Sequence, residues 1–224
     1  MTFSISARCP RTGQFGIAVS SSSPAVAARC AHARAGVGAV ATQNITDPTL
    51  GPKGLDLMAS GLSAPEALAR LKAEGAHIDY RQIALIDAEG RTAGFSGAKT
   101  LGTHHIAEGE NVVAAGNLLS SPLVPQAMVD AFSAAQGPLG DRLVAAMKAA
   151  LAAGGEEGPV HSVGMLIVDT VAWPVADLRV DWHETDPIGA LADLWELWKP
   201  QMDAYVTRAL DPSTAPSYGV PGDE

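Results

Sequence analysis

The alternation of apolar and polar positions predicts two short strands at the start of the chain. Residues 2–7 alternate apolar and hydroxyl side chains, and residues 15–20 alternate large apolar side chains with small ones. The segment 9–13 between them contains proline and glycine, as turns do. Two runs of period two joined by such a turn predict a β-hairpin. If the larger side chains share one buried face, Phe3 pairs with Val19.

The same patterns predict the remaining elements, with a period of two for strands and of three to four for helices. The predicted strands cover residues 36–42, 82–87, 91–96, 112–117, 161–169 and 177–182. The predicted helices cover residues 53–60, 63–75, 123–135, 139–153 and 187–210, the last one kinked or broken near Pro200. Ser63 and Glu66 have the spacing of a capping box. Residues 24–33 predict a short helical or irregular connection, and residues 44–52 a loop.

The order of these elements predicts the α+β class. Strands alternate with pairs of helices, which suits two packed sheets with helices outside them. No internal repeat or linker divides the chain. We therefore expect one domain over residues 1–210, followed by a proline-rich tail over residues 211–224.

Composition and charge exclude several classes of protein. Of 224 residues, 47% are hydrophobic and 17% are charged, which is ordinary for a globular domain. The net charge is −9 and no basic run occurs, so the chain lacks the clustered Lys and Arg that bind phosphates. We expect no nucleic-acid partner.

Hydropathy and cysteine usage predict a cytoplasmic protein. No apolar run is long enough to span a bilayer, and the first residues lack the basic and apolar regions of a signal peptide. Cys9 and Cys30 have neither metal nor redox spacing, so we expect reduced thiols. We expect no membrane partner.

Thr2 is the candidate nucleophile. If Met1 is removed, Thr2 carries a hydroxyl and a free α-amine on one residue, and small second residues permit this removal. An α-amine has a pKa of about 7.7–8.0, so it can act as a base near neutral pH. This pairing is one way to activate a weak hydroxyl nucleophile. In the predicted register Thr2 lies opposite Ser20. An ordinary first strand that begins with Thr would show the same pattern.

Several segments resemble the DUF1028 family, which is grouped with the N-terminal nucleophile hydrolases. They are residues 20–30, 34–43, 44–48, 54–57, 61–68, 116–117 and 177–181. The Gly-Val-Gly-Ala-Val-Ala-Thr-Gln block at 36–43 is the most specific of them. The resemblance covers most of residues 1–200. It implies a four-layer αββα sandwich of two mainly antiparallel sheets, with Thr2 as the nucleophile.

The resemblance also implies roles for polar residues near strand ends. Asn117 is the candidate side-chain donor to a developing oxyanion, although an Asn at a strand end also serves as a turn residue. The candidate substrate-binding residues are Ser20, Ser21, Ser22, Gln43 and Asn44. The serines can equally form a polar loop at a strand exit, and Asn44 can equally be a loop residue.

The histidines do not predict a metal site. His104 and His105 are adjacent in a segment that is interpreted as a further strand, so their side chains would point to opposite faces. No set of His, Cys, Asp or Glu has the spacing of zinc ligands. We expect neither a metal nor another cofactor.

Together these features predict a threonine amidohydrolase that cleaves a small amide or peptide-like bond through an acyl-enzyme. One alternative is a non-catalytic binding or assembly protein on the same scaffold. The other is a metal-dependent hydrolase that uses His32, His104 or His105. The four tryptophans are interpreted as packing or subunit contacts, which leaves a homo-oligomer open.

Overall fold

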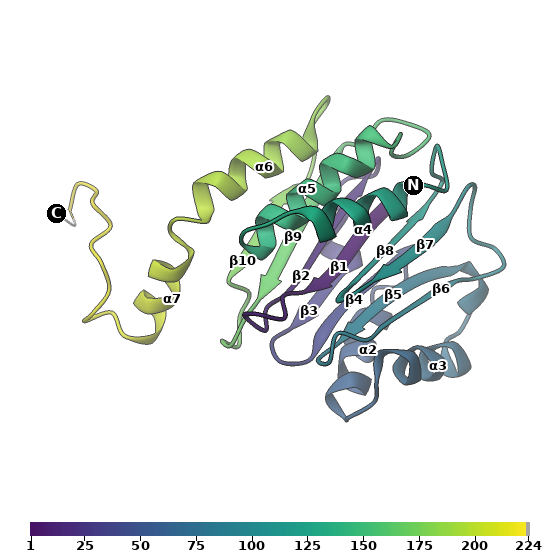
Figure 1. The fold of residues 1–224 in the computed structure, drawn as a ribbon, viewed down its shortest axis with the longest axis horizontal. Helices are drawn as coiled ribbons and strands as arrows, with labels where there is room; N and C mark the ends of the chain where they lie inside the picture. Colours follow the sequence, from purple (N-terminus) through teal and green to yellow (C-terminus); the bar gives the residue numbers. More distant parts are fainter. Residues whose placement is uncertain (223–224) are drawn as a thin grey trace.

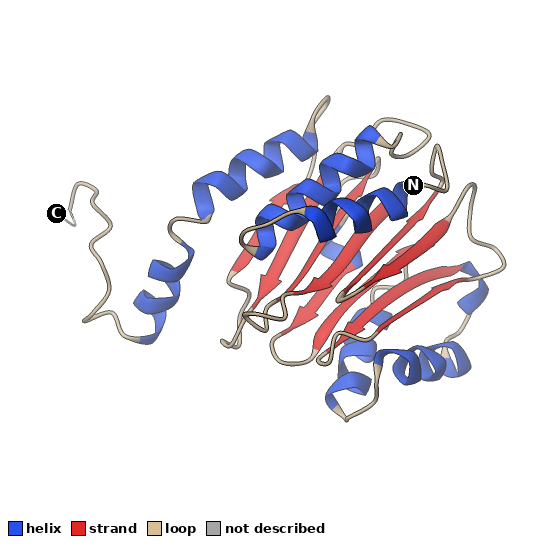
Figure 2. Ribbon diagram, in the orientation of Figure 1, coloured by secondary structure: helices blue, strands red, loops and turns tan. Residues whose placement is uncertain are grey.

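The computed structural model describes residues 1–222 and has two antiparallel sheets packed face to face between helices (Figures 1 and 2). Each sheet buries one face against the other sheet and the other face against helices. The predicted fold class, an α+β sandwich of two antiparallel sheets with helices outside, is confirmed.

The larger sheet has six strands in the order β10-β9-β2-β1-β8-β7, so β1 lies in its interior. Its strands are β1 (Thr2–Arg8), β2 (Phe15–Ser21), β7 (His105–Gly109), β8 (Val112–Asn117), β9 (Ser162–Val168) and β10 (Ala176–Val180). The smaller sheet has the order β3-β4-β5-β6. Its strands are β3 (Ala31–Arg34), β4 (Gly38–Asn44), β5 (Arg81–Asp87) and β6 (Thr92–Ser96).

Helices cover the outer face of each sheet (Figure 1). Over the larger sheet lie α4 (Val124–Ala134), α5 (Leu139–Ala152) and α6 (Pro187–Trp198), and over the smaller sheet lie α2 (Leu50–Ala59) and α3 (Ala64–Glu74). The short helices α1 (Ala27–Cys30) and η1 (Ile78–Tyr80) lie in connections. The capping box predicted from Ser63 and Glu66 is present at the start of α3.

The predicted register of the first hairpin is wrong by one residue. Phe3 pairs with Ser20 instead of Val19. The prediction required the large side chains of both strands to share one face. In the structure both strands are buried on both faces: the large side chains of β1 pack under the helices, whereas those of β2 pack between the sheets. As a result, Thr2 lies opposite Ser21.

Two segments also differ from the predictions. Strand β3 forms where a helical or irregular connection was predicted, because α1 takes only four residues and the half-buried segment after it pairs with β4. Helix α2 begins at Leu50, inside the predicted loop. The break predicted near Pro200 is confirmed: the segment 187–210 forms two helices, α6 and α7 (Met202–Leu210), separated around this proline.

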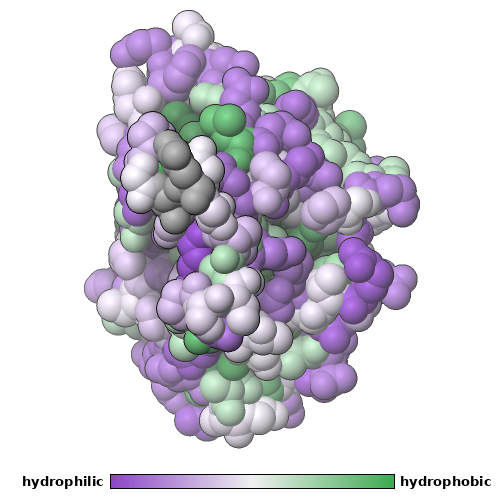
Figure 3. All heavy atoms as spheres, turned by 90° about the vertical axis from the view of Figure 1, so that its left-hand side faces the viewer, coloured by the Kyte–Doolittle hydropathy of each residue, from purple (hydrophilic) through white to green (hydrophobic). Residues whose placement is uncertain are grey.

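Helix α7 and the segment after it extend away from the sheets (Figure 1). Every residue of α7 keeps some solvent exposure. Figure 3 views the molecule from this side, where apolar side chains lie among predominantly polar ones. Leu197 and Leu210 are among the exposed apolar residues of α6 and α7.

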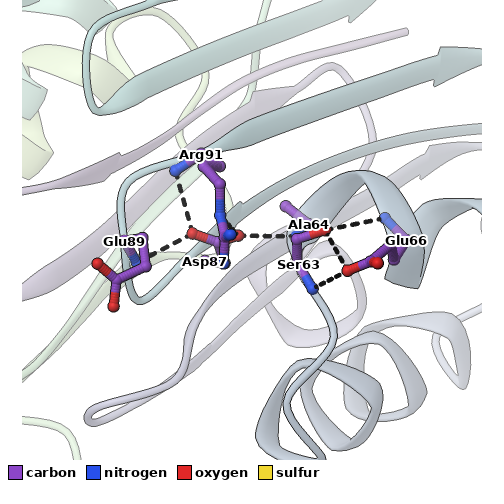
Figure 4. Close-up of polar contacts among 6 residues, drawn as sticks. All are labelled: Ser63, Ala64, Glu66, Asp87, Glu89 and Arg91. Atoms are coloured by element: carbon purple, nitrogen blue, oxygen red, sulfur yellow. Dashed lines mark hydrogen bonds and ion pairs between the residues drawn. The ribbon is translucent and has the colours of Figure 1, made fainter.

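The Asp87 side chain accepts hydrogen bonds from both the β5–β6 turn and the start of α3 (Figure 4). One carboxylate oxygen accepts the backbone N–H groups of Glu89 and Arg91, both at 3.0 Å. The other accepts the Ala64 N–H and Arg91 Nε, both at 2.8 Å. The carboxylate lies at a helix N-terminus, where negative charge is stabilised. Asp87 is therefore a buried acid whose two carboxylate oxygens are both hydrogen-bonded, and it lies at the end of the smaller sheet that is remote from Asn117.

Candidate active site

Thr2 lies at one end of the larger sheet, between the last residues of two neighbouring strands. Antiparallel pairing sets the start of β1 beside the ends of β2 and β8. Thr2 is therefore paired with Asn117 on one side and is opposite Ser21 on the other. Paired residues project to the same face of a sheet. All three residues are buried, with Thr2 6% exposed.

Met1 covers the Thr2 hydroxyl. Both Thr2 Oγ1 and Ser21 Oγ donate hydrogen bonds to the Met1 carbonyl oxygen, the second at 2.6 Å. The Met1 side chain lies against the 154–159 turn, since a Cβ added at Gly158 would come within 3.3 Å of Met1 Cε. The Met1 acyl group thus occupies the space next to the candidate nucleophile.

A polar ladder runs between the sheets beside Thr2. Ser4 Oγ donates to Gln43 Oε1 at 2.7 Å, and Gln43 Nε2 donates to Gln82 Oε1 at 2.7 Å. Asn117 Nδ2 donates to the same Gln82 oxygen at 3.1 Å. All four side chains are fully buried. These bonds fix the orientation of the Asn117 amide, whose Oδ1 has no hydrogen-bond partner in the described part of the chain.

The predicted substrate-binding residues occupy different environments. Ser20 is fully buried and donates to the Ser162 carbonyl at 2.9 Å, so its hydroxyl is committed to the backbone. Asn44 has φ of 74° and joins two loops, donating to the Tyr80 carbonyl at 2.6 Å and accepting from Leu101 N at 3.2 Å. Ser21 lies opposite Thr2, and Gln43 is linked to Asn117 through the shared Gln82 oxygen.

Glu156 is a site residue that the sequence analysis missed. Its side chain is 5% exposed and belongs to the turn after α5. The Ser22 N–H donates to Glu156 Oε2 at 3.2 Å, while Oε1 finds no hydrogen-bond partner among residues 1–222. Burial raises the pKa of this carboxyl to about 7, against the opposing effect of the nearby N-terminal ammonium.

The glycine-rich turn brings Glu156 to Thr2 through backbone pairing that is distant in sequence. Glu156 forms a bridge with Leu119, just beyond the end of β8. The Ser120 N–H donates to the Gly155 carbonyl at 3.1 Å. The spacing of glycines and acids in this segment predicts a turn, but nothing in it specifies which strand end the turn will contact.

The histidines do not form one cluster, although the His161 ring lies 3.0 Å from the His183 carbonyl. His32 packs against Gly51, and burial lowers the pKa of its imidazole. His104 Nδ1 lies 2.9 Å from the Gly102 carbonyl, and the His161 ring stacks on Trp182 with centroids 4.4 Å apart. Within residues 1–222, no three His, Cys, Asp or Glu side chains are grouped so that they could hold a metal ion.

Two hollows lie near the opposite end of β1. One has a volume of about 530 Å³ and lies between Arg34 and Trp173, and the other, of about 280 Å³, lies between Cys9 and Arg142. Neither is lined by a candidate site residue. In the described chain no helix is long and apolar enough to cross a bilayer.

Comparison with known proteins identifies one family. A family model described as "Family of unknown function (DUF1028)" matches residues 2–191. The crystal structure of protein SPO2555 from Silicibacter pomeroyi, described with the same family model, is similar to this chain with a TM-score of 0.82. The two are 30% identical, and 88% of each chain is covered. No curated protein matches the sequence.

Two more distant structures are those of Anbu. Anbu (ancestral beta-subunit) from Yersinia bercovieri has a TM-score of 0.40 at 10% identity, covering 91% of this chain and 97% of the other. Anbu from Hyphomicrobium sp. strain MC1 has a TM-score of 0.36 at 9% identity, covering 92% and 98%. Neither similarity is close enough to carry an argument about this chain.

Proposed function

The chain belongs to the DUF1028 family, and from this premise we propose that it is an N-terminal threonine amidohydrolase. The observation that carries the proposal is the placement of the Met1 carbonyl. Its oxygen accepts hydrogen bonds from Thr2 Oγ1 and Ser21 Oγ at the start of an interior strand. A carbonyl in this place is in contact with the candidate nucleophile and with a second hydroxyl donor.

The mechanism requires Thr2 to become the first residue. Release of Met1 uncovers the Thr2 hydroxyl and converts an amide nitrogen, which has no basic lone pair, into an amine. The amine takes the proton of Oγ1 while Oγ1 bonds to the carbonyl carbon of the substrate. The electron pair of the C=O bond moves to oxygen, and the Ser21 hydroxyl donates to that oxygen.

The remaining steps restore Thr2. The oxyanion collapses, the substrate C–N bond breaks, and the departing nitrogen takes the proton held by the Thr2 amine. Water then adds to the ester, and its hydrolysis releases a carboxylic acid and the free Thr2 hydroxyl. Asn117 has a second Nδ2 hydrogen besides the one directed at Gln82, and we assign it as a further donor to the oxyanion.

Substitution of Thr2 tests the proposal. Thr2→Ala keeps a small second residue and an α-amine but removes the hydroxyl, so amide hydrolysis should fall by at least about 10³-fold. Thr2→Ser keeps a hydroxyl and should retain activity. Hydrolysis of acyl anilides by purified variants measures this, with intact mass confirming the first residue.

Circular dichroism provides the control for folding. Wild-type turnover by Thr2→Ala would overturn the mechanism. Loss of activity in both variants without loss of structure would also contradict it, because serine supplies the same nucleophilic atom.

A further inference from the structure

Met1 shows how an aminoacyl group fits beside Thr2. Its carbonyl contacts the hydroxyls of Thr2 and Ser21, and its side chain lies against Gly158. Within residues 1–222 no ion pair joins its α-ammonium to Glu156, and this ammonium acts on the carboxyl only through its charge, which opposes the rise in the pKa of Glu156. The carbonyl oxygen and the side chain of Met1 therefore contact two different parts of the protein, and the charge of its ammonium acts on a third, Glu156.

The place of Met1 approximates the place of a substrate acyl group. The nitrogen and Oγ1 of Thr2 are bonded to adjacent carbon atoms. An acyl carbon bonded to one of them forms a five-membered ring when it approaches the other. An acyl group bonded to Oγ1 in the acyl-enzyme thus lies close to the Met1 acyl group bonded to nitrogen. This step rests on the function proposed above.

Glu156 is positioned to receive a cation at this place. It is 5% exposed, and the bridge to Leu119 holds its backbone. One carboxyl oxygen accepts the Ser22 N–H, and the other has no hydrogen-bond partner among residues 1–222. A buried carboxylate with an unused oxygen is costly unless an ammonium or another donor pairs with it.

We infer that Glu156 binds the α-ammonium of the substrate, and that the substrates are compounds with an unblocked aminoacyl group, such as aminoacyl amides and peptides with a free N-terminus. The substrate carbonyl then lies between Thr2 and Ser21, and its first side chain lies toward Gly158. An N-acylated analogue leaves the buried carboxylate without its partner, and a site built around such a pairing rejects the analogue strongly.

The charge on Glu156 makes this recognition depend on pH. Burial raises the pKa of the carboxyl to about 7. The charged group that faces it from the start of β1 is the N-terminal ammonium, and the end of β2 contributes the uncharged Ser22 N–H. Binding of an ammonium should therefore strengthen as Glu156 ionises above about pH 6 and weaken again as the α-amine of the ligand loses its proton near about pH 8, with a maximum between these values.

A binding experiment separates recognition from hydrolysis. The protein is produced with Thr2 as its first residue, from a fusion whose protease leaves Thr2 free, and it carries Thr2→Ala when turnover would consume the ligand. Calorimetry compares L-methioninamide with N-acetyl-L-methioninamide. We expect the first to bind and the second to bind at least about 10-fold more weakly, because acetylation removes the positive charge.

Two glutamate variants provide the matched comparison. Glu156→Gln should weaken methioninamide binding at least about 10-fold at about pH 7.4, where both the carboxylate and the ammonium are present, and leave binding of the acetylated compound unchanged. Glu157→Gln removes the exposed neighbouring carboxylate and should change neither. Equal binding of both compounds, methioninamide binding unaffected by Glu156→Gln, or no binding of methioninamide would each overturn the inference.

Hydrolysis distinguishes this inference from the proposed function. One possible result is that methioninamide binding depends on Glu156 but the form with a free Thr2 cleaves no aminoacyl anilide. This result would contradict the amidohydrolase and support the ammonium site. Cleavage of free and N-acetylated anilides at equal rates would support the amidohydrolase and contradict the ammonium site.

Discussion

Two buried acids at opposite ends of the sandwich have very different surroundings. Asp87 is 2% exposed and Glu156 is 5% exposed. The Asp87 carboxylate accepts four hydrogen bonds, including one from the Arg91 side chain. Glu156 accepts one hydrogen bond, from Ser22, and one of its oxygens is left without a partner among residues 1–222.

The difference indicates which acid serves the fold and which is available for chemistry. Asp87 joins the β5–β6 turn to the N-terminus of α3, and its hydrogen-bonding capacity is used. Buried polar groups in folded proteins are almost always paired, so an exception suggests a function. The exception at Glu156 is in contact with Ser22, which follows the Ser21 hydroxyl that contacts the Met1 carbonyl, and its pKa responds to the charge of the N-terminal ammonium.

The largest effect expected from this comparison is on the pH dependence of stability at Glu156. Because the folded pKa is raised to about 7, the folded state holds a proton that the unfolded state releases near its ordinary lower pKa. The stability of wild type should thus be full below that lower pKa and fall as pH rises through about 7.

Glu156→Gln removes this titration. Between about pH 5 and pH 8, the free energy of unfolding of wild type should fall relative to that of Glu156→Gln by up to about 3 kcal/mol. Urea denaturation at a series of pH values measures the difference. Parallel curves for the two proteins would mean that Glu156 is not held in a desolvated state.

A somewhat smaller effect is expected at Asn117, and it should appear in turnover. Asn117→Ala should lower kcat by about 10²-fold, since one donor to the oxyanion is lost. Gln82 Oε1 keeps the hydrogen bond from Gln43, which limits the structural cost. Steady-state kinetics and thermal melting are compared on the same preparation. A large fall in Tm with kcat unchanged would make Asn117 a purely structural residue.

The smallest effect is expected at Asp87, on stability alone. Asp87→Ala leaves the Ala64 N–H and the turn amides without their acceptor and should lower the free energy of unfolding by about 2 kcal/mol. For a chain of this length, that corresponds to a fall in Tm of about 4–8 °C. Activity per folded molecule should not change.

The exposed Glu89 side chain in the same turn provides the control, and Glu89→Ala should change stability by less than about 0.5 kcal/mol. Loss of activity in folded Asp87→Ala would show that the two ends of the sandwich are coupled.

The sequence predicted most elements because their patterns are local. The hairpin of β5 and β6, the capping box at Ser63 and the paired helices α4 and α5 each follow from residues close together in the chain. The first hairpin was predicted with the wrong register because an interior strand buried on both faces does not reveal which large side chains share a face.

The site was predictable only in part, for a related reason. Thr2 and Asn117 were identified as candidates from their places at strand ends and from the family resemblance. Their pairing follows from the strand order β2-β1-β8, which joins segments distant in sequence. Glu156 lies in a turn without hydrophobic periodicity. Its position depends on contacts with Leu119 and Ser22 that no local pattern encodes.

The measurement that tests the central claim most directly is the activity of one protein with and without residues before Thr2. One form begins at Thr2, a second keeps an uncleaved N-terminal extension, and a third begins at Thr2 and carries a C-terminal tag as control. Intact mass confirms each terminus, and circular dichroism confirms the fold. We predict hydrolysis of an aminoacyl anilide by the first and third forms and none by the second, because an acylated nitrogen has no basic lone pair and the extension covers the Thr2 hydroxyl. Equal activity per folded molecule in all three would contradict a catalytic role for the free Thr2 amine.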